Sequence, residues 1–369
     1  MELIRNQLRA FSARAFCTPE VVDVARSALS RWPSYSVTPL LCLGQLAAEL
    51  QLGEIWLKYE GSRFGIGSFK ALGAGYAVDS LLKREFRDQD PENLTVACAS
   101  DGNYGRAVAW AAQQVGCACV VYLPRQVTEY REKAIHQYNG RTLRVQGNYD
   151  AAEAAVKRAT REHGWVLFSD SSHENHAVIP QDVMTGYCVM LSEIADSVPL
   201  ENFTHVFLQC GVGAFAAAVC DYLHSALGSK APILVSVEPL RAACVFTSVE
   251  QGRLMVVGGA LTTIMAGLAC GRPSPLAWEL LRRQLSFCAA LEDGWAVRAV
   301  RLLASGRTSG EPVVAGETGA AGLGALLCAA HDAKWRLQLG LNSSSRVLLF
   351  CTEGATDPDI YDSIIREGR

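Results

Sequence analysis

Short hydrophobic runs of strand length alternate with longer, alanine-rich stretches of helical periodicity along most of the chain. The short runs in the first half are LTVACAS, CACVVYLP, RTLRVQG and WVLFSD, and the helical stretches between them are GRAVAWAAQQVG, EYREKAIHQYNG and NYDAAEAAVKRATREHG. Apolar runs of this length are typical of buried strands, and a glycine after an amphipathic stretch ends a helix. The repeated strand–helix–strand order predicts a parallel sheet with helices on both faces.

The second half repeats this alternation. In chain order, its segments are the strand THVFLQC, the helix AFAAAVCDYLHSALG, the strand PILVSVEP, the helix GAAGLGALLCAAHDAKW and the strand RVLLFCTEG. We therefore predict an α/β fold with two doubly wound lobes and mostly parallel sheets. Residues 245–310 have fewer strand-like runs and more turns, so we expect this segment to cover part of the molecule.

Composition and charge narrow the function. Half of the 369 residues are hydrophobic, which is enough for a large core, and the net charge of -3 gives no basic surface for nucleic acid or membranes. The apolar runs are too short or too interrupted to span a bilayer, and the N-terminal segment MELIRNQLRAFSARAF has no sustained apolar core typical of a secretory signal. We expect no nucleic-acid and no membrane partner.

The chain has 13 cysteines, an odd number without disulfide spacing. This pattern indicates reduced thiols and a cytoplasmic location. Cys117 and Cys119 are close together, but no second pair and no histidine follows them at a ligand-like spacing. We interpret them as buried free thiols and expect no metal site.

Ligands of open α/β sheets bind beyond the carboxyl ends of the strands. After VFLQC comes Gly211–Phe215, GVGAF, at the start of an alanine-rich helix. Glycines there let backbone N–H groups converge on an anion, and the helix N-terminus adds its positive dipole end. This is a candidate phosphate cradle, although a tight strand-to-helix turn would have the same sequence.

Polar side chains also follow three other predicted strands. They are Asp101 and Asn103 after VACAS, Asp170, His173 and His176 after VLFSD, and Thr352 and Glu353 after LLFCT. Asp101 would equally serve as a helix cap, and the two histidines would equally lie on a surface loop. A hydroxyl such as that of Thr352 is suited to a hydrogen bond with a ring nitrogen.

Lys70 lies in a glycine- and serine-rich loop, EGSRFGIGSFKALG, directly before an apolar helix. A solvated lysine needs no such setting. A lysine that forms a Schiff base must be partly desolvated and held against its carbonyl partner.

These segments together resemble the pyridoxal-phosphate enzymes of fold type II, the tryptophan synthase β group, and within it the diaminopropionate ammonia-lyase family. Eight blocks are similar and occur in order between about residues 35 and 358: YSVTPL, EGSRFGIGSFKALGAGYAV, SDGNYGRAVAW, IPQDVMTGY, QCGVGAF, TTIMAGLACG, AGETGAAGL and CTEGATDP. The resemblance implies a carbon–nitrogen lyase that converts 2,3-diaminopropionate to pyruvate and ammonia by α,β-elimination, through a Lys70 Schiff base and aminoacrylate.

The resemblance also implies roles for individual residues. Pyridoxal 5'-phosphate would be held by Lys70, by Asn103 at its phenolic oxygen, by Thr352 at its ring nitrogen, and at its phosphate by Gly211, Val212, Gly213, Ala214 and Phe215. Asp101 and Asp170 would be the carboxylates for proton abstraction. We expect Asp101 to serve the D-enantiomer, and Asp170 or the released Lys70 to serve the L-enantiomer. Ser68, Tyr104, His173 and His176 are the candidates for substrate contacts.

The family design further implies a homodimer of two-domain subunits. Residues 1–72 and 197–369 would form the large cofactor-binding domain, and residues 73–196 a small mobile domain. Two departures lie on the substrate side: Tyr104 stands where the family has histidine, and His173 and His176 fall where it has aromatic residues. Tyr104 would either contact substrate or only fill the volume of the usual histidine.

Two alternatives stay open at this point. One is a β-eliminase or β-replacement enzyme that acts on serine, threonine or another β-substituted amino acid. The other is a non-catalytic pyridoxal-phosphate-binding protein, which would be expected to lack the lysine or the glycine cradle; this sequence has both.

Overall fold

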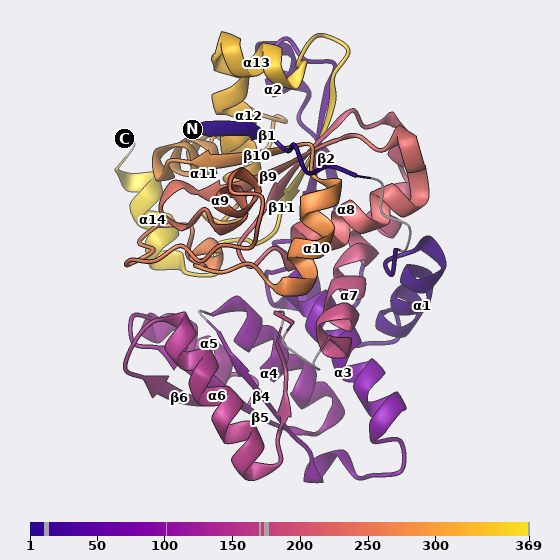
Figure 1. Cartoon of the computed structure of the whole chain (residues 1–369), viewed down its shortest axis with the longest axis vertical. Helices are drawn as coiled ribbons and strands as arrows, with labels where there is room; N and C mark the ends of the chain where they lie inside the picture. The colour runs from indigo at the N-terminus through magenta and orange to yellow at the C-terminus, as the bar shows by residue number, and fades with distance from the viewer. Residues whose placement is uncertain (11–14, 101, 170, 173–176, 368–369) are drawn as a thin grey trace.

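The computed structural model spans residues 1–369 and describes all of them except 11–14, 101, 170, 173–176 and 368–369. The described chain forms two lobes, each built around one sheet, and Figure 1 shows the larger lobe above the smaller. Most strand pairs are parallel, so the predicted α/β class and the two doubly wound lobes are confirmed.

The sheet of the larger lobe has seven strands in the order β1-β10-β9-β8-β11-β3-β2. Its five inner strands are parallel to one another, whereas the edge strands β1 and β2 are antiparallel to their neighbours. The strands are β1 (Glu2–Arg5), β2 (Leu40–Cys42), β3 (Glu54–Tyr59), β8 (His205–Gln209), β9 (Ile233–Pro239), β10 (Phe287–Leu291) and β11 (Arg346–Cys351).

The sheet of the smaller lobe has four parallel strands in the order β6-β5-β4-β7. They are β4 (Thr95–Ala99), β5 (Ala118–Pro124), β6 (Arg141–Val145) and β7 (Val166–Leu167). These are the four strands predicted for the first half of the chain.

Helices cover both sheets, and α7 packs against α3, α1 and α8, so that it connects the lobes (Figure 1). The helices are α1 (Pro19–Leu29), α2 (Gly44–Glu49), α3 (Lys70–Glu85), α4 (Asn103–Val115), α5 (Glu129–His136), α6 (Tyr149–His163), α7 (Val178–Ala195), α8 (Ala214–Leu227), α9 (Cys244–Glu250), α10 (Pro275–Gln284), α11 (Asp293–Ala304), α12 (Ala321–His331), α13 (Ala333–Leu339) and α14 (Pro358–Arg366).

Alternation along the central strands explains this layering. In β8, Val206 and Leu208 point into the core that contains α8 and α10, whereas Phe207 points into the core that contains α11 and α12. Successive side chains of a strand face opposite sides of the sheet, so a strand that is apolar at every position must be covered on both faces.

Local signals set several helix ends. The Asn148 side chain accepts a hydrogen bond from the Ala151 N–H at 3.2 Å and caps α6. Gly116 and Gly164 follow α4 and α6 with φ of 84° and 69°, the left-handed conformation that favours glycine. The predicted glycine stop of NYDAAEAAVKRATREHG at Gly164 is therefore confirmed. The stop predicted for EYREKAIHQYNG at Gly140 is wrong, because α5 already ends at His136.

One predicted helix is wrong. The stretch GAAGLGALLCAAHDAKW is divided at Asp332, where α12 has ended and α13 begins. The Asp332 carboxylate accepts hydrogen bonds from the N–H groups of Lys334 and Trp335 at 2.9 and 3.1 Å. An N-cap therefore outweighs helical continuity at this position.

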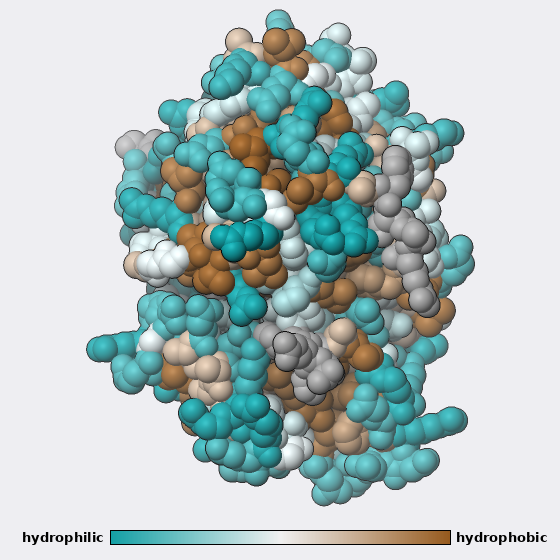
Figure 2. Space-filling model, in the orientation of Figure 1, coloured by the Kyte–Doolittle hydropathy of each residue, from teal (hydrophilic) through white to brown (hydrophobic). Residues whose placement is uncertain are grey.

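The hydrophobic residues form no membrane-spanning helix in the described ranges: none of these helices is both long enough and apolar enough to cross a membrane. On the face drawn in Figure 2, hydrophilic and hydrophobic side chains are interleaved over both lobes.

Candidate active site

A pocket between the two lobes brings together most of the predicted site residues. It lies at the carboxyl ends of β8 and β11 of the larger sheet and of β4 of the smaller sheet, and its cavity has a volume of about 90 Å³. This is the position at which open α/β sheets bind ligands. The residues that line it are Ser68, Phe69, Lys70, Ala99, Ser100, Gly102, Asn103, Tyr104, Arg131, Tyr149, Gln209, Gly211, Val212, Gly213, Ala214, Phe215, Gly267, Leu268, Cys270, Thr318, Thr352 and Glu353.

Lys70 begins α3, and the loop before it is fastened to the end of β11. The Phe69 N–H donates to the Thr352 carbonyl at 3.1 Å, and the Gly354 N–H donates to the Gly67 carbonyl at 3.0 Å. Ser68 pairs with Glu353 in an antiparallel bridge between these two contacts. The backbone of the lysine loop is therefore held by a β-bridge to the segment that follows the last strand of the sheet.

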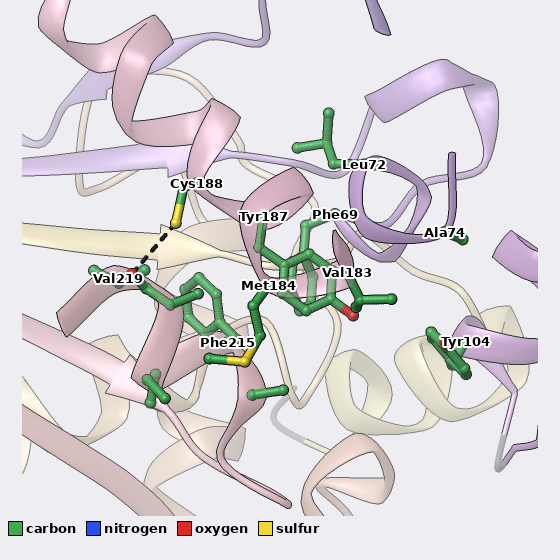
Figure 3. Packing of buried hydrophobic residues seen from close by; sticks show 14 of the residues in the cluster. Phe69, Leu72, Ala74, Tyr104, Val183, Met184, Tyr187, Cys188, Phe215 and Val219 are labelled. Atoms are coloured by element: carbon green, nitrogen blue, oxygen red, sulfur yellow. Dashed lines mark hydrogen bonds between the residues drawn. The ribbon is translucent and has the colours of Figure 1, made fainter. Parts of the chain in front are cut away.

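Aromatic rings surround the Lys70 amino group. Its Nζ lies 5.3, 5.4 and 5.5 Å from the ring centres of Phe69, Tyr104 and Tyr187. The Phe69 ring lies 4.6 Å from that of Tyr187 and 5.0 Å from that of Phe215, an arrangement that Figure 3 shows from close by. Such rings exclude water and attract an ammonium group, so they hold the amine in a partly desolvated place.

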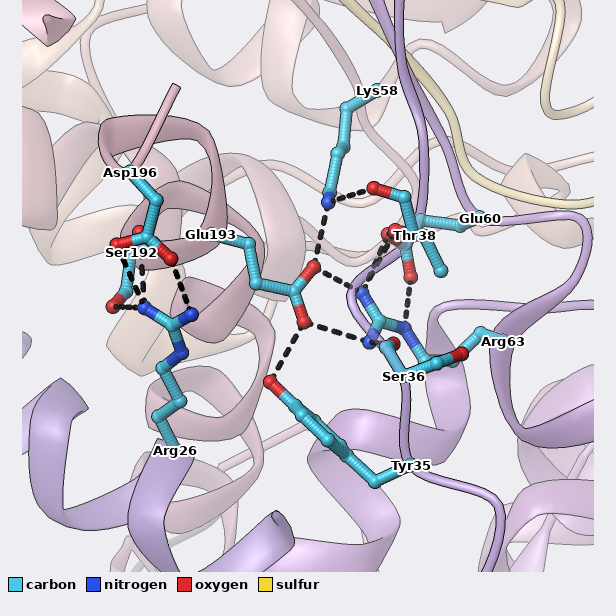
Figure 4. Close-up of polar contacts among 10 residues, drawn as sticks. All are labelled: Arg26, Tyr35, Ser36, Thr38, Lys58, Glu60, Arg63, Ser192, Glu193 and Asp196. Atoms are coloured by element: carbon cyan, nitrogen blue, oxygen red, sulfur yellow. Dashed lines mark hydrogen bonds and ion pairs between the residues drawn. The ribbon is translucent and has the colours of Figure 1, made fainter. Parts of the chain in front are cut away.

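A buried network of charges supports the start of the lysine loop (Figure 4). Arg63 donates to both oxygens of Glu60 and of Glu193 at 2.7 to 2.9 Å, and Lys58 donates to Glu193 at 2.6 Å. Thr38 adds a hydrogen bond from its hydroxyl to Glu60 at 2.5 Å. Burial raises the pKa of Glu193, but Arg63 and Lys58 outweigh it and the pKa lies below its ordinary value. The positive charges of Lys58 and Arg63 are therefore balanced by the negative charges of the two glutamates.

The same loop contains strained backbone. Phe64 has φ of 51°, and Gly65 and Gly67 have φ of 71° and 82°. The left-handed conformation is costly for phenylalanine and must be held by its surroundings. The Phe64 ring packs at 4.6 Å from the ring of Trp110, and at 5.9 Å from that of Tyr35.

The GVGAF segment forms a close turn before α8. Gly213 is the N-cap of α8 with φ of 94°, and a Cβ there would lie 2.8 Å from Leu281. A Cβ at Gly211 would lie 3.1 Å from the Gly267 carbonyl oxygen. The left-handed φ thus favours glycine at position 213, and position 211 is crowded for any larger residue. The turn presents the N-terminus of a 14-residue helix to the pocket.

Asn103 and Glu353 meet across the pocket. Asn103 begins α4, and its Nδ2 donates a hydrogen bond to Glu353 Oε2. Glu353 Oε1 also accepts from the Thr318 N–H at 3.2 Å, and Glu353 Oε2 from the Thr356 hydroxyl at 3.3 Å. Thr352, the residue before Glu353, is 2% exposed and lines the same wall.

Further acidic residues lie behind Glu353. Arg131 donates to Glu317 Oε1 at 3.1 Å, and its Nε lies 3.5 Å from Asp357 Oδ2. Burial, and secondly the charge of Glu353, raise the pKa of Glu317 to about 7, although Arg131 opposes this shift. This side of the pocket is therefore rich in carboxylates.

The structure places the predicted residues as follows. It brings Lys70, Ser68, Asn103, Tyr104, Thr352 and the whole segment Gly211–Phe215 to the lining of one pocket. Asp101, Asp170, His173 and His176 lie outside the described residues. Cys117 and Cys119 are buried, and the described residues contain no group of three potential metal ligands.

Sequence reasoning missed several lining residues, among them Gln209, Arg131, Tyr149 and Thr318. Gln209 is the last residue of β8, so the strand-end rule would have found it. Arg131 lies inside a polar helix and has no local signal of burial.

Comparisons with known proteins agree with this geometry. The family model described as "Pyridoxal-phosphate dependent enzyme" matches residues 32–353. Diaminopropionate ammonia-lyase of Escherichia coli (strain K12) is 35% identical over 364 residues, which cover 94% of this chain and 91% of that protein.

Two crystal structures of the Escherichia coli enzyme are similar over 100% of this chain and 97% of theirs. The complex with the aminoacrylate-PLP azomethine reaction intermediate has a TM-score of 0.93 at 32% identity, and the apo form a TM-score of 0.85 at 28% identity.

Proposed function

Since the chain belongs to the pyridoxal-phosphate-dependent enzymes and, within them, to the diaminopropionate ammonia-lyase family, we propose that it eliminates ammonia from 2,3-diaminopropionate, or a closely related β-substituted alanine, to give pyruvate and ammonia. The observation that carries this proposal is the convergence on one pocket of an amine, Lys70, the glycine turn Gly211–Phe215 and the polar end of β11.

The residues of the pocket fit pyridoxal 5'-phosphate. The turn Gly211–Phe215 lines the pocket, a Cβ at Gly211 would be crowded against the lining residues Gly267 and Cys270, and the N-terminus of α8 favours a phosphate there. Lys70 Nζ would bind the cofactor's aldehyde carbon, Thr352 its ring nitrogen and Asn103 its phenolic oxygen. When bound, the cofactor supplies an electron sink for the charge left when a bond at the substrate Cα breaks.

The protein itself supplies position and proton transfer. The rings of Phe69, Tyr104 and Tyr187 hold the amine of Lys70 and exclude water around it. We assign removal of the Cα proton to a carboxylate or to the Lys70 amine: Asp101 for the D-enantiomer, and Asp170 or Lys70 for the L-enantiomer. An amine leaves poorly unless it is protonated, so a group in the pocket must keep the distal amine in its ammonium form.

Contacts with substrate are assigned to Ser68, Tyr104, His173 and His176. Ser68 and Tyr104 line the pocket on the same side as Lys70, which supports the first two assignments. Tyr104 and the two histidines are the departures from the family pattern, so the exact β-substituent is the part of the proposal that needs direct measurement.

The proposal includes the organisation of the protein. We assign residues 1–72 and 197–369 to a large cofactor-binding domain and residues 73–196 to a small mobile domain, a division supported by the two separate sheets. We also propose that the protein is a homodimer and that it is located in the cytoplasm. All 13 cysteines are free thiols, which suits a reducing compartment. Light scattering of the purified protein tests the dimer.

Pyruvate release from a panel of β-substituted alanines tests the reaction. We expect a visible absorption band with the cofactor, loss of that band in Lys70→Ala, and the highest kcat/KM with 2,3-diaminopropionate. A higher kcat/KM with serine or threonine would favour the alternative β-eliminase, and formation of a β-substituted product from an added nucleophile would favour a β-replacement enzyme.

The division of labour between the carboxylates has its own test. Asp101→Asn should lower turnover of D-2,3-diaminopropionate far more than that of the L-enantiomer. An equal loss on both enantiomers would contradict the assignment.

A further inference from the structure

A row of polar contacts joins the two lobes along one wall of the pocket. Each contact has one member in α4, in α5 or at the N-cap of α5 in the smaller lobe, and the other in the larger lobe. The pairs are Asn103 with Glu353, Thr128 with Asp357 at 2.9 Å, and Arg131 with Glu317 at 3.1 Å and with Asp357 at 3.5 Å.

Arg131 is the centre of this row. The residue is 9% exposed, and its two carboxylate partners are 3% exposed each. Charges so far from water need a partner of opposite sign, and a buried pair that loses one member leaves an uncompensated charge. Among the contacts described for this group, Arg131 is the cation that pairs with Glu317 and Asp357. If its charge were removed, these two carboxylates and that of Glu353 would lie near one another without a positive charge to balance them.

Arg131 also supports the turn before α4. Gly102 has φ of 147°, and a Cβ at this position would lie 2.9 Å from the Cδ of Arg131. The aliphatic part of Arg131 therefore packs directly against the turn that leads into Asn103. A single side chain thus contacts the Gly102–Asn103 turn and pairs with the opposite lobe.

We propose that Arg131 is a positioning residue that fastens the smaller lobe over the cofactor pocket, so that retention of the cofactor depends on its pairing with Glu317 and Asp357. This inference rests on the proposed mobility of residues 73–196. Arg131 need not touch the reacting atoms: it keeps the wall that carries Asn103 in place. Loss of the pairing would let this wall move away and open the pocket to water.

The test measures how fast bound cofactor leaves the holoenzyme. Arg131→Met keeps an unbranched side chain that can still pack against Gly102 but removes the charge, and we expect it to release pyridoxal phosphate roughly tenfold faster or more. Asp357→Asn should also accelerate release, and the double variant should be no faster than Arg131→Met, because both changes break the same contact. Arg131→Lys should restore part of the retention.

Arg84→Met is the matched control. Arg84 pairs with Asp182 at 3.0 Å between α3 and α7, away from the pocket, with side chains that are 35% and 16% exposed. Arg84→Met should release pyridoxal phosphate at the same rate as the unchanged protein. Release within twofold of the control in Arg131→Met, or additive effects in the double variant, would overturn the proposal.

The release assay measures only how fast pyridoxal phosphate leaves the protein, so its result does not depend on which amino acid is the substrate. A protein that holds its cofactor through Arg131 but releases no pyruvate from any β-substituted alanine would refute the proposed reaction and leave this inference standing. If circular dichroism shows that Arg131→Met does not fold, the decision rests on Asp357→Asn, because this variant keeps the arginine and removes the charge of one partner. Unchanged cofactor release in Asp357→Asn would refute the role of Arg131.

Discussion

The charge network under the lysine loop allows a sharp stability prediction. Glu193 accepts hydrogen bonds from Tyr35, Lys58 and twice from Arg63, at 2.6 to 2.9 Å, as Figure 4 shows. Glu193→Gln removes one of two negative charges that balance two positive charges, and it turns NH₂ hydrogens toward the donors of Arg63 or Lys58. Removal of one partner from a buried pair costs about 3–5 kcal/mol.

This magnitude applies because the groups are removed from water. The side chains of Lys58, Arg63 and Glu193 are at most 1% exposed, so solvent cannot screen the remaining charge. A loss of about 3–5 kcal/mol is a large part of the 5–15 kcal/mol that stabilises a typical domain. We therefore expect a clear fall in the urea midpoint of Glu193→Gln, measured by circular dichroism on the holoenzyme.

Asp196→Asn is the control from the same end of α7. Asp196 pairs with Arg26, and these side chains are 54% and 25% exposed, so the loss should be about 1 kcal/mol or less. Lys58→Met combined with Glu193→Gln restores the charge balance and should cost less than the sum of the single changes. The reasoning is refuted if Glu193→Gln destabilises the protein no more than Asp196→Asn does.

Three further predictions concern the glycine turn, an acidic group and the thiols. Gly213→Ala should weaken binding of the cofactor by about tenfold or more, because alanine is strained at φ 94° and its Cβ would lie 2.8 Å from Leu281. Fluorescence titration of the apoprotein with pyridoxal phosphate would measure this loss. The folded pKa of Glu317, raised from 4.5 to about 7, costs stability increasingly as pH rises through this interval, so urea unfolding should show Glu317→Gln gaining on the unchanged protein by up to about 3 kcal/mol between pH 5 and 8. A thiol reagent should label the exposed Cys42 first and the half-buried Cys270 more slowly, with the eleven buried cysteines labelled only after unfolding, as peptide mapping would show.

The sequence predicts those parts of the pocket that have a local cause. The glycines of the 211–215 turn, the lysine at the start of an apolar helix and the hydroxyl at the end of the last strand each carry a signal in neighbouring residues, and the structure brings all three to one pocket. The strand-end rule placed the glycine turn and the hydroxyl, because parallel strands align their carboxyl ends, whereas the lysine was found from its own loop.

The row of contacts between the lobes could not be predicted in this way. Arg131 lies in EYREKAIH, a stretch that is typical of a solvated helix, and Glu317 is 186 positions further along the chain. Their burial results from the packing of two lobes, which no local pattern contains. The end of α12 was missed for the opposite reason: Asp332 is a strong local cap inside a stretch of uninterrupted helical periodicity.

The bridge between Ser68 and Glu353 has a consequence for biosynthesis. The reactive lysine leaves the ribosome well before the segment around Glu353, which holds its backbone, has been translated. A nascent polypeptide thus carries an ordinary lysine amine and can capture its coenzyme in the native manner only once Glu353 has been added. Incomplete translation products should therefore remain colourless.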